Sequence, residues 1–212
     1  MENQKLVVEK CIDDIEDRVG GVFNDLKAFV YIRNNSLQHK EENIGGGNIV
    51  IALSLFSCLN LLAKVHYCTV RPDKFEDDGS CKDETASFLY FMKNIQKSGL
   101  DLGLPDSGDA LQLIWNGFRN WLAHRLTVQP GKQVITFNFD VGTQNSVQES
   151  LDYAKQHKVF EDSDNDGRNW VVNCDALLAR LPEIVEITVN QLRDSSKLNT
   201  ELLLNVIGVE YP

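Results

Sequence analysis

The first part of the chain has apolar residues at intervals of three and four, the spacing that places side chains on one face of an α-helix. Residues 2–18 carry one such stripe, and residues 22–40 carry a second one after Gly20-Gly21. Because glycine is a poor helix former, the glycine pair predicts a break between two helices. The glycine-rich segment 43–47 predicts the end of the second helix.

Residues 49–67 are apolar nearly all round, which is typical of a helix enclosed by other helices or lying in a membrane. Ser54, Ser57 and Asn60 interrupt the run before it reaches the about 20 uninterrupted apolar residues that a span needs. We therefore expect a central buried helix and no contact with a membrane.

Two more helices are predicted after a polar, turn-rich loop at 71–83. Apolar residues at helical spacing predict a helix over 85–97, which Gly99 closes. Asp109 is a candidate N-cap for a helix whose apolar side reaches Leu122.

The pattern changes to strands after Pro130-Gly131. Alternation over 133–140 predicts a β-hairpin, and a weaker helix is expected at 143–158. Residues 158–173 predict two short strands around a turn at 162–167.

A last helix is predicted over 175–195, with Asp175 as its candidate cap. Pro182 predicts a kink or a later start. The whole pattern indicates one mainly α domain over 1–212, a helical bundle with a small β-hairpin insertion at about 127–173.

Composition narrows the class of protein further. With 42% apolar and 25% charged residues the chain is expected to fold as a globular domain. Its net charge of −10 argues against non-specific binding to nucleic acid, although a local basic patch stays open. The N-terminal residues lack the pattern of a signal peptide, and the five scattered cysteines suggest reduced thiols, so we expect a cytoplasmic protein.

The densest chemical signal is the segment Arg119-Asn120-Trp121-Leu122-Ala123-His124. At about 100° per residue Asn120 and His124 share one stripe of a helix, whereas Arg119 and His124 are about 140° apart. The guanidinium must therefore curl toward the imidazole or meet one from a second copy. Histidine exchanges protons near neutral pH and arginine binds phosphate with two hydrogen bonds, so the pair needs no metal.

This segment resembles the motif of the HEPN superfamily, all-helical proteins with an arginine, usually a polar residue next, and a histidine after four to six intervening positions. The resemblance implies a HEPN-like helical bundle, a homodimer with a composite cleft, and metal-independent RNA cleavage. It implies that His124 is the acid/base, that Arg119 binds the phosphate and the transition state, and that Asn120 orients the site. No cofactor is implied.

Three further residues are candidates for an accessory role in the proposed site, and the motif residues also have a purely structural interpretation. Arg125 follows the motif directly, and Arg33 with His39 forms a second match on an early helix. Alternatively, Arg119 and His124 are surface residues in the last turn of a helix, where the dipole favours positive charge. Arg33 and His39 would then belong to a solvated helix end.

The loop Asp162–Gly167 copies the first half of a calcium-binding EF-hand loop, but Asn173 stands where the bidentate glutamate is expected. We favour a hairpin turn and keep weak calcium binding as the alternative. His66, Cys68 and Cys81 lack a paired spacing and a fourth ligand, so no metal site is predicted.

The tryptophans at 115, 121 and 170 occupy apolar positions, which favours the core over stacking on bases. The motif and the helical layout favour a cytoplasmic HEPN-type endoribonuclease acting on RNA. The resemblance alone implies the prokaryotic toxin or phage-defence class and a regulatory or antitoxin protein as a further partner. The alternative is a catalytically inactive helical interaction or scaffold module.

Overall fold

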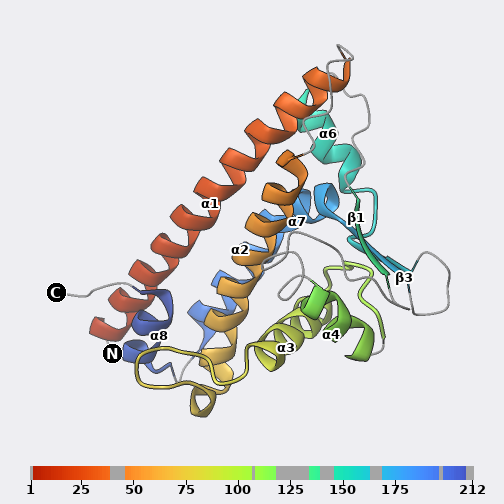
Figure 1. The fold of residues 1–212 in the computed structure, drawn as a ribbon. Helices are drawn as coiled ribbons and strands as arrows, with labels where there is room; N and C mark the ends of the chain where they lie inside the picture. The colour runs from red at the N-terminus through yellow and green to blue at the C-terminus, as the bar shows by residue number, and fades with distance from the viewer. Residues whose placement is uncertain are drawn as a thin grey trace. The chain divides into compact units, whose positions relative to one another are not determined.

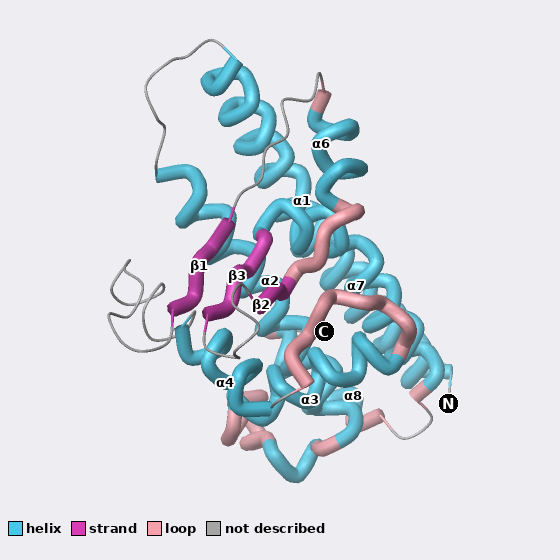
Figure 2. The backbone as a smooth tube through the Cα atoms, turned by 90° about the vertical axis from the view of Figure 1, so that its right-hand side faces the viewer, coloured by secondary structure: helices cyan, strands magenta, loops and turns pink. Residues whose placement is uncertain are grey.

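The computed structural model describes residues 2–38, 46–106, 108–117, 134–138, 146–162, 169–195 and 198–208. These residues are mainly helical with a small sheet, as Figures 1 and 2 show, so the predicted fold class of a mainly α bundle with a small hairpin is confirmed. The helices are α1 (Glu2–Gln38), α2 (Gly46–Val70), the short 3-10 helix η1 (Pro72–Lys74), α3 (Glu84–Lys97), α4 (Gly108–Asn116), α6 (Val147–Ala154), α7 (Cys174–Asp194) and α8 (Thr200–Ile207). The strands are β1 (Val134–Asn138), β2 (Phe160–Asp162) and β3 (Asn169–Asn173).

Helix α1 is continuous, so the predicted break at Gly20-Gly21 is wrong. Its buried positions keep helical spacing across the glycines, because Val19 and Leu26 lie seven residues apart, close to two turns. A methyl group at either glycine would meet nothing within 4 Å. The glycines lower the helix propensity by only about 1 kcal/mol each, and the buried stripe outweighs that cost.

Helix α2 is the apolar helix expected at 49–67. Most of its residues from Ile51 to Cys68 are buried or half-buried, which confirms the prediction of a buried helix. It starts at Gly46, so the last two glycines of 43–47 open this helix and do not lie between helices. Within the described ranges it is the one helix long and apolar enough to cross a membrane, a test that a core helix also passes.

The chain forms two compact units. The first contains Met1–Gly21, Cys58–Leu100 and Pro182–Pro212, and the second contains Val22–Ser57 and Asp101–Leu181. The expectation of one domain over the whole chain stays a prediction.

In the first unit, α8 lies beside the first turns of α1 (Figure 1). The side chain of Gln4 donates a hydrogen bond to the carbonyl of Leu198 over 3.0 Å, and Arg18 donates to the carbonyl of Ile207 over 2.9 Å. This helix was not predicted from the sequence, although Asn199 caps its start and Gly208, with φ of +73°, ends it.

The loop predicted at 71–83 is an ordered turn in the same unit. Phe75 and Cys81 form an antiparallel bridge, and Asn205 of α8 donates to the carbonyl of Asp77 over 2.7 Å. Helix α3 follows with Asp83 as its N-cap, and Gly99 lies just past its end with φ of +94°, so the predicted helix and its closing glycine are confirmed.

In the second unit the strands form a sheet in the order β1-β3-β2 (Figure 2). Strands β2 and β3 pair antiparallel, which confirms the two short strands expected at 158–173. The hairpin expected at 133–140 is wrong, because β1 is one strand that pairs in parallel with β3. A parallel pair needs a long crossover, here containing α6 and β2, and local alternation does not reveal such a partner.

Helix starts differ from the predicted caps at two places. The amide of Ala176 donates to the side chain of Asn173 over 3.0 Å, so Asn173 caps α7 and the buried Asp175 lies in its first turn. Helix α7 runs through Pro182, which excludes the late start. Likewise α4 begins before Asp109, which lies in the first turn of that helix.

Candidate functional site

The predicted catalytic segment lies outside the described residues. This applies to Arg119, Asn120 and His124 and also to the accessory candidates Arg125 and His39. Arg33 lies in α1, but its side chain is not described. The composite cleft therefore stays a prediction from the motif.

The described chain leads up to this segment through α4. Ala110, Leu111, Ile114 and Trp115 are buried and form the apolar side predicted for this helix. The burial of Trp115, and of Trp170 on β3, confirms the core interpretation for these two tryptophans. The third tryptophan, at 121, lies outside the described ranges.

A buried histidine in the first unit has a strongly perturbed acid/base equilibrium. His66 on α2 is 5% exposed, and its ring lies 5.8 Å from that of Tyr90 and 5.9 Å from that of Phe91, both on α3. Burial lowers the pKa of His66 from 6.5 to about 4. Its imidazole is thus neutral and enclosed at neutral pH, unlike a general acid in an open cleft.

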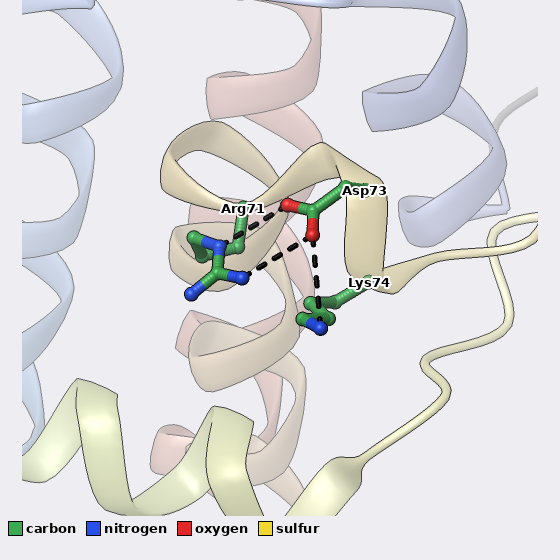
Figure 3. Close-up of polar contacts among 3 residues, drawn as sticks. All are labelled: Arg71, Asp73 and Lys74. Atoms are coloured by element: carbon green, nitrogen blue, oxygen red, sulfur yellow. Dashed lines mark hydrogen bonds and ion pairs between the residues drawn. The ribbon is translucent and has the colours of Figure 1, made fainter.

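An exposed cluster of charges follows the end of α2, as Figure 3 shows. The guanidinium of Arg71 donates to both carboxylate oxygens of Asp73, over 3.1 and 3.2 Å, and the ammonium of Lys74 lies 3.7 Å from the same carboxylate. The hydrogen bond from Arg71 lowers the pKa of Asp73. Because Nε and Nη2 of Arg71 already bind Asp73, whose negative charge repels a phosphate, this cluster is a poor phosphate site.

The cysteines are free thiols, as the sequence predicted. Burial raises the pKa of Cys11 and of Cys58 to about 11 and that of Cys68 to about 12. A raised pKa leaves almost no thiolate at neutral pH, so these side chains are core residues without nucleophilic character.

The described part of the chain contains no group of three histidine, cysteine or acidic side chains that could hold a metal ion. Asp162 is the last residue of β2, and 163–168 lie outside the description. Strands β2 and β3 pair antiparallel. The two interpretations of the loop Asp162–Gly167, a hairpin turn and weak calcium binding, stay predictions.

Comparisons with protein-family models, with curated proteins and with solved structures found no match to this chain.

Proposed function

We propose that this protein is a metal-independent endoribonuclease of the HEPN type, with Arg119, Asn120 and His124 as its catalytic residues. The observation that carries the proposal is the Arg-Asn-x3-His spacing in a chain that is mainly helical. These three residue types supply a phosphate ligand, an orienting amide and a proton carrier within six positions.

In the proposed reaction His124 accepts the proton of a ribose 2′-hydroxyl. The 2′-oxygen then attacks the adjacent phosphorus, and the bond to the 5′-oxygen of the next nucleotide breaks. The products are a 2′,3′-cyclic phosphate and a 5′-hydroxyl end. Arg119 stabilises the charge that grows on the phosphate oxygens, and a protonated histidine supplies the leaving group with its proton.

A second copy of the chain completes the site in this proposal. On the helix that the sequence predicts, Arg119 and His124 would be about 140° apart, so two copies related by a two-fold axis would bring a guanidinium and an imidazole together more readily than one copy does. Pairing two arginines also creates a local positive region on a chain whose net charge is −10.

A second candidate is an inactive interaction module. Phe29, Tyr31 and Ile32 on α1 are all exposed, and neighbouring exposed apolar side chains of this kind are typical of surfaces that contact another protein. In this alternative Arg119 and His124 are surface residues, and the chain works by binding a regulatory partner.

RNA cleavage in the presence of EDTA tests the proposal. Purified protein should cut single-stranded RNA to products that carry cyclic phosphate ends, and His124→Ala should abolish cutting while the melting temperature stays that of the wild type. Equal cutting by the wild type and by His124→Ala would contradict the proposal and favour the interaction module.

A further inference from the structure

His66 in the first unit has an unusual combination of burial and missing hydrogen bonding. Its Nε2 atom is buried and finds no hydrogen-bond partner among the described residues. The backbone carbonyl of the same residue accepts a hydrogen bond from the hydroxyl of Thr69 over 2.7 Å, a contact that leaves the ring untouched. Within the described chain, ring packing holds the imidazole in place.

The rings around His66 come from two helices. Tyr90 of α3 is stacked on the imidazole with an angle of 23° between the ring planes, and Phe91 is tilted against it at 51°. Tyr67 of α2 lies 5.7 Å from Tyr90 and 6.2 Å from Phe75, centroid to centroid. Tyr90 is 46% exposed, so the ring that is stacked on the imidazole also contacts solvent.

Among the described residues of α2 and α3, no charged side chain is a counter-ion for His66. From α3 the titratable group that faces it is the phenol of Tyr90. On α2, Lys64 is paired with Glu84 of α3 over 2.5 Å, and the thiol of Cys68 donates to the carbonyl of Val65. Burial is the only cause of the shifted pKa of His66, which agrees with the lack of a neighbouring carboxylate in this part of the chain.

We propose that protonation of the His66 imidazole separates α2 from α3 where they pack together in the first unit. We call the contact of His66 with Tyr90 and Phe91 the layer; it is closed when the rings are packed and open when water reaches the imidazole. An imidazolium ion among Tyr90 and Phe91 would lack both solvent and a hydrogen-bond acceptor for its buried Nε2–H. Such an ion is stable only when water reaches it. We expect water to enter where Tyr90 and Phe91 of α3 cover the ring, and this entry loosens the contact between the two helices.

The direction of the pH dependence follows from proton binding. The pKa of His66 is lowered from 6.5 to about 4 in the closed layer, so the open state binds the proton more strongly. The contribution of the neutral imidazole to the stability of the closed layer is complete above pH 6.5. This contribution decreases as the pH falls from 6.5 toward 4, and it does not decrease further below pH 4. The difference between these two pKa values limits the total rise of the opening equilibrium constant to about 300-fold. Between pH 7 and pH 4.5 the constant should rise on the order of 50-fold.

Hydrogen exchange at pH 7 and pH 4.5, corrected for intrinsic exchange rates, tests the proposal on the full chain. In the wild type the opening equilibrium of residues 62–70 and 86–95 should rise on the order of 50-fold at the lower pH. His66→Phe keeps an aromatic ring but cannot be protonated, so most of this rise should vanish. Phe91→Leu is the matched control: it loosens the same layer at both pH values and should keep the rise.

Two results would overturn the proposal. One is the same pH-dependent rise in His66→Phe and in the wild type, which would assign it to other groups. The other needs no variant: NMR titration of the folded wild type should show His66 titrating near pH 4, and a midpoint near 6.5 would show that its proton does not open the layer.

Discussion

The contact between α8 and the turn before α3 depends on a single glycine. Gly79 has φ of +84°, a left-handed conformation that side chains other than glycine rarely adopt. A Cβ atom there would lie 2.5 Å from the carbonyl carbon of Asn205 and 2.6 Å from the amide nitrogen of Val206. These are backbone atoms of α8, which cannot rotate away as a side chain can.

Gly79→Ala should therefore reduce the free energy of unfolding through two effects. The left-handed conformation costs an alanine about 1–2 kcal/mol. Forcing a methyl group into the backbone of α8 adds about 1–3 kcal/mol, the usual cost of overpacking. The sum is about 2–5 kcal/mol, and each kcal/mol lowers the melting temperature of a chain of this length by about 2–4 °C.

Two other glycines provide matched controls. Gly99 has φ of +94°, but a methyl group added there would meet nothing within 4 Å, so Gly99→Ala should show the conformational cost alone. Gly21 lies in α1 with open space around it, so Gly21→Ala should stabilise the protein by about 0.5–1 kcal/mol. Urea denaturation of the three variants measures the differences. Equal losses for Gly79→Ala and Gly99→Ala would refute the close approach of α8 to this turn.

Two further predictions concern assembly and calcium. The composite site requires a two-fold dimer, so light scattering at micromolar concentration should report about twice 23.9 kDa, and a monomer under these conditions would remove that argument. Because Asn173 is the N-cap of α7 and the loop at Asp162 lacks the glutamate of a calcium site, millimolar calcium should leave the melting temperature unchanged. A rise of several degrees with calcium and none with magnesium would show a true calcium site.

Local sequence signals were sufficient to predict a helix that has both a periodic apolar stripe and a capping residue. Helix α3 has a regular apolar stripe, and the predicted range 85–97 with its closing Gly99 agrees to within one residue with Glu84–Lys97. Helix α8 carries the same kind of signals, Asn199 and Gly208, but eight residues are too few for a periodic stripe to stand out.

Non-local packing decided the elements that the sequence analysis assigned wrongly. The propensity of Gly20-Gly21 argued for a break in α1, and the buried stripe from Val19 to Leu26 overrode it. The partner of β1 is a strand that begins 31 residues after β1 ends, so alternation alone could not identify it. For the proposed site, the sequence supplies the residue types of Arg119 and His124, whereas the geometry of the proposed composite cleft would depend on how two copies meet.

The most direct test of the proposed ribonuclease is the exchange Arg119→Lys, measured as the rate of RNA cleavage in EDTA. Lysine keeps the charge but lacks the planar pair of donors, so a guanidinium that holds the phosphate cannot be replaced by it. Arg71→Lys, at the exposed ion pair with Asp73, is the control for an arginine outside the proposed site. We predict that Arg119→Lys loses most of the wild-type rate while Arg71→Lys retains it. An Arg119→Lys variant that cleaves as fast as the wild type would contradict the proposed role of this motif.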